Sequence, residues 1–439
     1  MAIIIKNNIT IEHSVSTNFM FNTIKKDLTI ANPSWVNASR MSLPMWGIQK
    51  DLKYYTEEDG NLIVPAGYLD NLVRLLPNEP VVDQRISTGL PLEVEFKGTL
   101  RDYQEAAVNV MLSKVQGVLS APTGAGKTIC LIALICRRRL PTLITVNTIE
   151  LGNQFIDSLV KFTDLQKEDI GFIGDGRYEV KPITVALLQT LTKLDPADID
   201  MFPQVISDEV HVCAASTFYA ALTRLSAKYK VGCSATPARE DGLTSVIFWA
   251  TGPLRHEIDL SNLGNVLLKP TYRQVLTNYF YPLVSSDEYQ LMLNHMAEDP
   301  VRNKQISDEV AKYGTQQCLL LCQRHLQVDA LMALIPGSVG MTSKMTKKKR
   351  AATMAALLTG QHRIVISTFA LFSTGIDIPN LEILFIAAPI KSKNKIKQSI
   401  GRIMRKGSIT KVPEVIDFVD SKVGLLKFQA TTRKRIIGS

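Results

Sequence analysis

The sequence predicts an α/β fold in which two tandem parallel-sheet lobes follow a small α+β N-terminal domain. Two observations lead to this fold class. The chain has 439 residues, 46% of them hydrophobic, which is too long for one ordinary core and apolar enough for two or three. From about residue 100 onward, short runs rich in Val, Ile and Leu alternate with helical patterns, as expected for helices that cover a parallel sheet.

Residues 1–95 are interpreted as the N-terminal α+β accessory domain. A turn signal at Asp59 and Gly60 is followed directly by a strand-like run, NLIVPA. An amphipathic stretch from Tyr68 to Leu76 then predicts one helix.

Two series of buried strands define the two lobes. The first lobe, residues 96–260, contains five predicted strands: VQGVLSA (115–121), PTLITV (141–146), ITVALL (183–188), QVISDE (204–209) and YKVGCSA (229–235). The second lobe, residues 291–439, contains four: QCLLLC (317–322), RIVIST (363–368), EILFIAA (382–388) and PEVIDFV (413–419). Residues 261–290 show no strong period, so we expect a linker or a protruding hairpin there.

The cysteines and the apolar runs favour a reduced, cytoplasmic protein. None of the six cysteines forms a Cys-x-x-Cys pair. Cys318 and Cys322 come closest to ligand spacing, but they lie in the run CLLLC, which reads as the core of a strand; we predict no zinc. The longest apolar run, Ile129 to Cys136, is far below the roughly 20 residues of a membrane span, and the N-terminus lacks the organisation of a signal peptide. No membrane association is expected.

The net charge of +9 is concentrated in the last third of the chain. Residues 1–95 carry −3 and residues 96–260 carry −1, whereas residues 261–439, with 25 Lys/Arg and 12 Asp/Glu, carry +13. Two clusters stand out: Lys344, Lys347, Lys348, Lys349 and Arg350, and then Lys391, Lys393, Lys395 and Lys397. Such clustering favours a polyanionic partner over a merely solvated surface.

The run APTGAGKT (121–128) follows a predicted strand and opens a helix, which is the context of a phosphate-binding loop. Its backbone amides would surround phosphate oxygens at the positive end of the helix. Lys127 would reach the β- and γ-phosphates, and the Thr128 hydroxyl would coordinate Mg²⁺. The residues predicted to contact ATP in this loop are Pro122, Thr123, Gly124, Ala125, Gly126, Lys127 and Thr128, with Ala121 in place of the first glycine of the general pattern.

Hydrolysis of a nucleotide bound with Mg²⁺ needs carboxylates to hold the metal and to orient water. The predicted strand QVIS is followed directly by the run DEVH at residues 208–211. Asp208 would bind Mg²⁺ through water and Glu209 would position the attacking water. The pair lies 81 residues beyond Lys127, with two predicted strands between them.

With these residues in place, the chain resembles superfamily 2 helicases over nearly all of residues 97–420. The motifs occur in the family's order: LRDYQ (100–104), VNTIELGNQF (146–155), ALLQTL (186–191), CSATPAREDG (233–242), STFALFSTGIDIP (367–379) and QSIGRIMR (398–405). The resemblance implies two RecA-like lobes, ATP and Mg²⁺ as cofactors, and a nucleic-acid partner.

Two segments indicate which branch of superfamily 2 the chain resembles. The run SATPAREDGLTSVIFWATGP is similar to the XPB-like and UvsW-type branch of the superfamily, and DEVH departs from the DEAD-box sequence in the same direction. The run YTEEDGNLIVPAGYLDNLVRLL resembles the domain that precedes the motor in phage UvsW-type branch-migration helicases. The implied function is ATP-dependent unwinding or branch migration of forked and junction DNA in replication, recombination or repair, in a host cytoplasm if a phage encodes it.

The resemblance also assigns roles to matching residues. It implies adenine recognition by Arg101 and Gln104, arginine fingers at Arg402 and Arg405, and a water-orienting or His211-contacting role for Gln398. His211, Ser234 and Thr236 would couple ATP state to lobe movement, with Gly375 and Asp377 in the reciprocal role; Thr374 stands where relatives often have Glu. Sequence-independent phosphate contacts are expected from Thr148, Thr190, Thr368, Lys347, Lys348 and Lys349.

Two other enzymatic interpretations stay open. An RNA helicase uses the same motor, and DEVH with the extended third motif counts against it without excluding it. A motor subunit of a restriction-type DNA translocase complex would act with a partner that cleaves DNA, and no nuclease constellation is recognisable here. A non-enzymatic clamp is disfavoured because every hydrolytic position is intact.

Overall fold

The computed structural model describes most of the chain as two compact units, Met1–Asp259 and Leu260–Ser439, and each is treated by itself. The described residues are 2–12, 18–210, 215–235, 239, 241–259, 270–283, 285, 288–373, 378, 381–403 and 412–438; within them, the side chains at positions 347, 351, 358, 373, 394, 398 and 402 are not described. Among the described residues, no helix combines the length and apolar content that crossing a bilayer requires.

The N-terminal domain is built on a five-stranded sheet with strand order β5-β6-β2-β1-β7. The strands are β1 (Ile3–Ile5), β2 (Asn8–Ile11), β5 (Thr56–Glu58), β6 (Asn61–Pro65) and β7 (Val81–Asp83), with α1 (Asn18–Asp27) and α3 (Leu69–Leu75) beside them. The predicted turn is a two-residue hairpin loop, in which both Asp59 and Gly60 adopt positive φ. The α+β prediction for this domain is confirmed.

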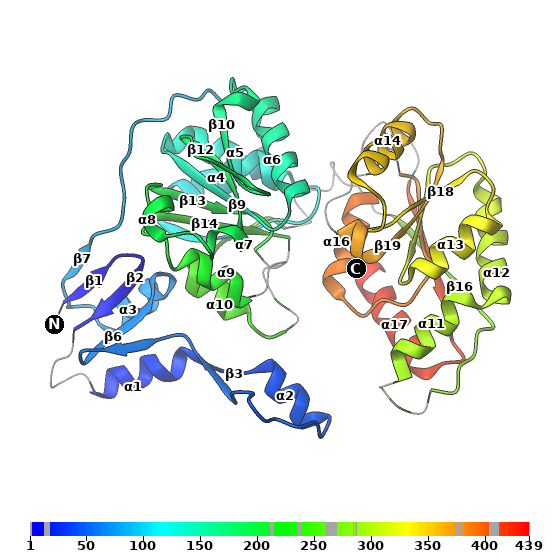
Figure 1. Ribbon diagram of the computed structural model, residues 1–439, viewed down its shortest axis with the longest axis horizontal. Coiled ribbons are helices and arrows are strands. Elements are labelled where there is room, and N and C mark those ends of the chain that lie inside the picture. The colour runs from blue at the N-terminus through cyan, green and yellow to red at the C-terminus, as the bar shows by residue number, and fades with distance from the viewer. Residues whose placement is uncertain are drawn as a thin grey trace. The chain divides into compact units, whose positions relative to one another are not determined.

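A projecting arm interrupts this domain between α1 and β5 (Figure 1). It consists of β3 (Thr29–Ala31), α2 (Pro33–Arg40), the tip loop (residues 41–48) and β4 (Asp51–Lys53). Within the part of the chain that the structure describes, the strands β3 and β4 pair only with each other. The sequence patterns give no sign of this arm, because its strands are short and solvated.

The first lobe contains an eight-stranded sheet with strand order β11-β10-β12-β9-β13-β14-β8-β15. Its strands are β8 (Gln116–Ser120), β9 (Thr142–Val146), β10 (Ile170–Gly174), β11 (Arg177–Glu179), β12 (Ile183–Leu187), β13 (Gln204–Ser207), β14 (Tyr229–Ser234) and β15 (Leu254–Glu257). All neighbours are parallel except β10 and β11. All five predicted strands are present, and their almost wholly buried residues explain their continuous apolar runs.

Helices connect these strands, as the predicted alternation requires. They are α4 (Asp102–Leu112), α5 (Lys127–Arg138), α6 (Ile149–Phe162), α7 (Leu188–Leu191), α8 (Pro196–Ile199), α9 (Ala215–Leu222) and α10 (Thr244–Thr251). The helix α5 follows β8 immediately after the phosphate-binding loop. The lobe is therefore a parallel α/β domain, as predicted.

The second lobe contains a six-stranded, wholly parallel sheet with strand order β16-β21-β20-β17-β19-β18. The strands are β16 (Thr271–Leu276), β17 (Cys318–Cys322), β18 (Ser338–Met341), β19 (Ile364–Thr368), β20 (Ile383–Ile386) and β21 (Glu414–Val419). The helices are α11 (Tyr289–Glu298), α12 (Pro300–Val310), α13 (His325–Leu334), α14 (Lys347–Leu358), α15 (Phe369–Ser373), α16 (Lys393–Ile403) and α17 (Gly424–Gly438). The four predicted strands are all present.

The expected linker or hairpin over residues 261–290 is wrong for residues 271–276, which form β16. Among the described residues, this strand lies at the edge of the second sheet and pairs with β21 alone. An edge strand stays half exposed, so its sequence, TYRQVL, lacks the apolar run by which the central strands are recognised. Residues 261–269 lie outside the described part of the chain.

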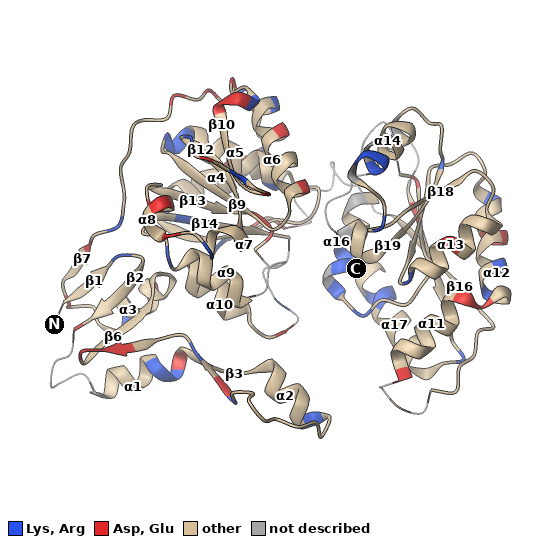
Figure 2. Cartoon of the chain, viewed as in Figure 1, with Lys and Arg blue, Asp and Glu red and all other residues tan. Residues whose placement is uncertain are grey.

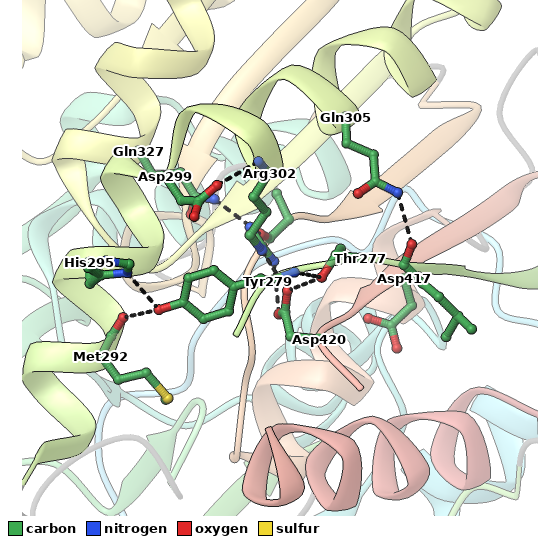
Figure 3. Close-up of polar contacts among 12 residues, drawn as sticks. Thr277, Tyr279, Met292, His295, Asp299, Arg302, Gln305, Gln327, Asp417 and Asp420 are labelled. Atoms are coloured by element: carbon green, nitrogen blue, oxygen red, sulfur yellow. Dashed lines mark hydrogen bonds and ion pairs between the residues drawn. The ribbon is translucent and has the colours of Figure 1, made fainter. Parts of the chain in front are cut away.

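A buried polar network holds one end of the second sheet together (Figure 3). The Arg302 guanidinium donates to both carboxylate oxygens of Asp420, at 2.7 and 3.1 Å, and to the carbonyl oxygen of Ala387 at 2.8 Å. Thr277 donates to the same Asp420 carboxylate at 2.6 Å, and Gln327 donates to the Ala387 carbonyl at 3.2 Å. Charges this deeply buried are tolerated because they are paired and hydrogen-bonded.

The N-terminal domain docks directly on the first lobe. The Gln116 amide donates to the carbonyl oxygen of Ala66 at 2.8 Å, and Arg255 pairs with Asp70 at 2.6 Å. A single hydrophobic cluster joins strands of the N-terminal sheet to α9 and α10 of the lobe. At the centre of this contact, Gly67 faces the backbone of α10 so closely that a Cβ there would collide with the carbonyl oxygens of Phe248 and Trp249.

This close approach predicts the effect of adding one methyl group. Gly67→Ala should destabilise the docked unit by about 1–3 kcal/mol, because a well-packed contact must open to admit the new carbon. Urea unfolding would measure the loss, and limited proteolysis would show an N-terminal domain that is cleaved more readily. Gly424→Ala is the matched control, since a Cβ at Gly424 meets no atom within 4 Å. Equal midpoints for the Gly67 variant and wild type would contradict the predicted docking.

Candidate active site

The phosphate-binding loop joins β8 to α5 and owes its shape to two glycines. Gly124 has φ of 92° and Gly126, the N-cap of α5, has φ of 81°. Both values lie in the left-handed region that side chains disfavour, so glycine is required at these positions. The Ala125 N–H, predicted to face phosphate, donates to the Pro122 carbonyl at 3.1 Å in this structure and so braces the loop.

Gln104 ties α4 to this loop. Its buried amide donates to the Ala125 carbonyl at 2.8 Å and accepts from the Arg101 N–H at 2.9 Å. The observed contacts therefore make Gln104 a support for the loop, and its recognition of adenine stays a prediction. The Arg101 side chain is exposed and donates to the Tyr103 hydroxyl at 3.1 Å.

The acidic pair lies beside the loop because of the strand order. In a parallel sheet all carboxyl ends meet at one edge, and β13 is separated from β8 only by β14. Lys127, at the start of α5, contacts Glu209 with an Nζ to Oε1 distance of 2.5 Å. The Glu209 backbone has φ of 50°, a strained value for a non-glycine residue, and its N–H donates to the Asp208 carboxylate at 2.9 Å.

The site carries more negative than positive charge. Burial, and then the charge of Glu209, raises the pKa of Asp208 to about 6. Burial also opposes the charge on Lys127, but the carboxylates of Glu209 and Asp208 outweigh it and raise the pKa of the ammonium group. Two carboxylates facing one ammonium group leave an excess of negative charge. This donor set fits a divalent cation that is bound by oxygen ligands, with Thr128 and Asp208 as the predicted ligands.

Ser234 connects the third motif to the loop. It ends β14 in register with Ser120, is fully buried, and its carbonyl accepts from the Ala121 N–H at 2.9 Å. A displacement of Ser234 would therefore shift Ala121 in the phosphate-binding loop, and the reverse. This is compatible with the predicted coupling role of Ser234.

The predicted phosphate-contacting threonines lie at the carboxyl ends of strands. The Thr148 hydroxyl follows β9 and caps α6 by accepting from the Leu151 N–H at 3.3 Å. Thr190 lies in α7, after β12. Thr368 ends β19, and its hydroxyl accepts from the Leu371 N–H at 3.4 Å. In Thr148 and Thr368 the hydroxyl oxygen accepts, which leaves the hydroxyl hydrogen to donate elsewhere; Thr148 is partly exposed, whereas Thr368 is buried.

Other predicted residues are only partly covered by the described structure. His211, Thr236, Gly375, Asp377 and Arg405 lie outside the described residues, as does Thr374. Gln398 and Arg402 lie on α16, and Lys347 lies at the start of α14, but their side chains are not described. Lys348 and Lys349 are exposed in the first turn of α14. The roles of all these residues stay predictions.

Sequence reasoning missed the polar support behind the acidic pair. The Asn147 amide donates to the Glu209 carbonyl at 3.4 Å, and the Thr145 hydroxyl donates to Ser207 at 2.7 Å. Thr145 lies near the end of β9 and Asn147 directly follows it, and β9 is adjacent to β13. Their position at the carboxyl end of a buried strand is the signal that could have found them.

Comparison with known proteins agrees with this geometry. Residues 97–239 match the family model described as "Type III restriction enzyme, res subunit", and residues 302–407 match "Helicase conserved C-terminal domain". A putative ATP-dependent RNA helicase, L396 of Acanthamoeba polyphaga mimivirus, is 27% identical, with 93% of this chain and 80% of the relative covered. The DNA 3'-5' translocase XPB2 of Sulfurisphaera tokodaii is 23% identical, with 81% and 90% covered.

Two solved structures are similar to this chain. T4 UvsW has a TM-score of 0.45 at 18% identity, covering 99% of this chain and 97% of its own. The S. cerevisiae Dbp5 structure bound to RNA and ADP BeF3 has a TM-score of 0.59 at 14% identity, covering 85% and 91%. The two family models and the likeness to Dbp5 confirm the tandem RecA-like fold. The protein is an ATP-dependent hydrolase of helicase superfamily 2, with a restriction-enzyme-type first lobe and a helicase C-terminal second lobe.

The site geometry predicts two distinct losses of activity. Lys127→Ala should abolish nucleic-acid-stimulated ATP hydrolysis by removing the phosphate clamp, and Glu209→Gln should abolish it by removing the group that orients water. Glu209→Gln should still bind ATP, measured with a fluorescent nucleotide, because its amide leaves Lys127 available to phosphate. Glu105→Gln, which disrupts an exposed ion pair with Arg137, is the control and should hydrolyse ATP normally. Near-normal turnover in either site variant would refute the assignment.

Proposed function

We propose that this superfamily 2 hydrolase is a DNA helicase or translocase that unwinds or branch-migrates forked and junction DNA. The observation that carries the proposal is the meeting of phosphate-binding loop, acidic pair and Ser234 at one edge of the first sheet. These are the parts that ATP hydrolysis requires. The proposal adds the substrate on which that hydrolysis acts.

The residues suggest how hydrolysis proceeds. A phosphate that binds Lys127 would replace the Glu209 carboxylate as its partner, and Glu209 would then be available to orient the attacking water. Mg²⁺, held by Thr128 and through water by Asp208, would neutralise charge on the β- and γ-phosphates. We propose that Arg402 and Arg405 supply the remaining positive charge as arginine fingers.

Two properties support DNA as the partner. The charge of +13 over residues 261–439 suits a polyanion, and the relative from S. tokodaii is named a DNA translocase. The resemblance of the extended third motif to the XPB-like branch points the same way. The relative from mimivirus is named an RNA helicase, so RNA is the first alternative to be tested.

A second candidate is a motor for a restriction-type translocase complex, favoured by the family model that matches residues 97–239. Such a motor would move along linear duplex DNA without a preference for a branch. Branch preference therefore separates the two candidates.

A substrate panel tests the proposal. ATP-dependent processing should be measured on linear duplex DNA, a DNA fork, a replication fork with two duplex arms, a four-way junction and an RNA fork of matched sequence. We expect the branched DNA substrates to be processed at least about tenfold faster than the RNA fork or linear duplex, which corresponds to about 1.4 kcal/mol of discrimination. Lys127→Ala should be inactive on all of them. Faster processing of the RNA fork would contradict the proposal that DNA is the substrate. ATP hydrolysis that linear duplex DNA stimulates, without unwinding, would favour the restriction-type motor.

The three lysines at the start of α14 give a separate prediction. Replacing Lys347, Lys348 and Lys349 with Gln should weaken DNA binding and flatten its salt dependence, by about one unit of log–log slope for each phosphate that the protein no longer neutralises. The control replaces Lys304, Lys312 and Lys422, which removes the same charge from elsewhere in the unit. Salt-titrated binding to a fork measures both variants. An unchanged slope in the α14 variant would mean that these lysines only solvate the surface.

A further inference from the structure

The tip loop of the arm exposes an unusual amount of apolar surface. Trp46 is 97% exposed, and Met41, Leu43 and Met45 are 52%, 51% and 40% exposed. A tryptophan in this state gains nothing from folding, because it buries almost none of its area. Clustered exposed apolar side chains on an otherwise polar projection mark a binding surface.

Hydrogen bonds that involve the backbone help to hold this loop in a defined shape. Asn32 caps α2 by accepting from the Ser34 N–H at 3.0 Å, and its amide donates to the Gln49 carbonyl at 2.8 Å. Within the tip, the Leu43 N–H donates to the Ala38 carbonyl at 2.8 Å. The apolar residues of the tip are thus presented outward by hydrogen bonds that involve the backbone.

The charge around the tip is positive, although the whole domain is acidic. Residues 29–53, which form the arm, carry three basic residues and one acidic one, a net charge of +2, so the rest of residues 1–95 carries −5. The basic residues of the arm are Arg40, Lys50 and Lys53. Lys25 and Lys26 lie at the end of α1, where Lys25 pairs with Glu57 at 2.8 Å. Figure 2 shows basic positions on the arm and at the end of α1. An apolar tip within a basic segment is complementary to nucleic acid, which has phosphates outside and flat apolar bases inside.

The base of the arm is fixed to the lobe that binds ATP. Tyr54, directly after β4, packs against Tyr219 of α9 with ring centres 4.9 Å apart and against Trp249 of α10 with centres 5.0 Å apart. Its N–H donates to the Leu28 carbonyl at 2.9 Å. The burial that accompanies this packing raises the pKa of the Tyr54 hydroxyl. Any movement of the first lobe would therefore carry the arm with it.

We propose that the tip loop contacts DNA at the branch point, where Trp46 stacks on an unpaired base and Arg40 and Lys50 contact flanking phosphates. This inference rests on the proposed DNA function. The tip loop would be the part of the protein that contacts the branch. Aromatic stacking on a base contributes about 1–3 kcal/mol and is tolerant of sequence, which suits an enzyme selective for structure.

The size of the patch favours a base over a protein partner. A stable protein interface engages about 20–30 residues a side, whereas the tip loop offers four large apolar side chains. One base needs a single aromatic face. The basic surroundings would also oppose an ordinary apolar protein surface, which brings no compensating negative charge.

Trp46→Ala is the central test, because an exposed side chain can be removed without loss of stability. We expect at least a tenfold lower rate of fork unwinding, with ATP hydrolysis stimulated by single-stranded DNA within about twofold of wild type, since about 1.4 kcal/mol is tenfold. Trp46→Phe should restore unwinding by keeping an aromatic face. Phe19→Ala, which removes another aromatic side chain of the same domain with 80% exposure, should behave as wild type.

Fluorescence reads the contact directly, whether or not the protein unwinds DNA. The chain has three tryptophans, Trp35, Trp46 and Trp249. Titration with a DNA fork should quench wild-type emission clearly more than that of Trp46→Phe. Equal quenching, or wild-type unwinding by Trp46→Ala, would overturn the inference. So would a change in oligomeric state on sedimentation of Trp46→Ala, because the tip would then be a protein interface. A wild-type protein that unwinds no DNA yet shows Trp46-dependent quenching would refute the proposed helicase function alone.

Discussion

The ion pair between Lys127 and Glu209 is the interaction around which the first lobe is organised. It joins the start of α5 to the end of β13, across the intervening strand β14. Both side chains are partly buried, at 11% and 20% exposure, so each charge loses part of its hydration and the other compensates for that loss. The pair in turn depends on β8, β14 and β13 ending at one edge. The strand order is therefore what converts two motifs 81 residues apart into one site, and the strained backbone at Glu209 shows that the position is held against a local cost.

The sequence was most informative where burial was greatest. Central parallel strands such as β9 and β17 are buried on both faces, so their apolar runs predicted both sheets, and the residues at their carboxyl ends predicted the site. The edge strands β15 and β16 were missed for the converse reason, because they are half solvated and carry mixed sequences. The strand β10 was also missed although all five of its residues are buried, because its sequence, IGFIG, contains two glycines, a residue that is depleted in strands. The support role of Gln104 could not be predicted either, because it depends on a hydrogen bond across 21 residues of sequence that no local pattern encodes.

Two segments of this chain resemble the UvsW-type branch of the superfamily: residues 55–76 of the N-terminal domain and residues 234–253 of the first lobe. The packing explains why they occur together in one chain. One contains Gly67 and the other contains Phe248 and Trp249, and these residues face each other across the contact between the N-terminal domain and the first lobe. The extended third motif thus forms a helix, α10, whose surface receives the accessory domain. Since β14 ends in Ser234 at the phosphate-binding loop and leads toward α10, one continuous stretch of chain connects the nucleotide site to the domain that bears the arm.

The second lobe shows the same use of buried polar groups, here beside a segment that leads to predicted site residues. Arg302 and Gln327 donate to the Ala387 carbonyl, and Gln323 donates to the Pro389 carbonyl at 2.9 Å. These carbonyls begin the stretch between β20 and α16, the helix on which Gln398 and Arg402 lie. An apolar core could stabilise this end of the sheet as well as the Arg302–Asp420 pair does, but it would supply no donors to that stretch. The buried network therefore fixes the start of the stretch that leads to α16, in addition to any contribution it makes to stability.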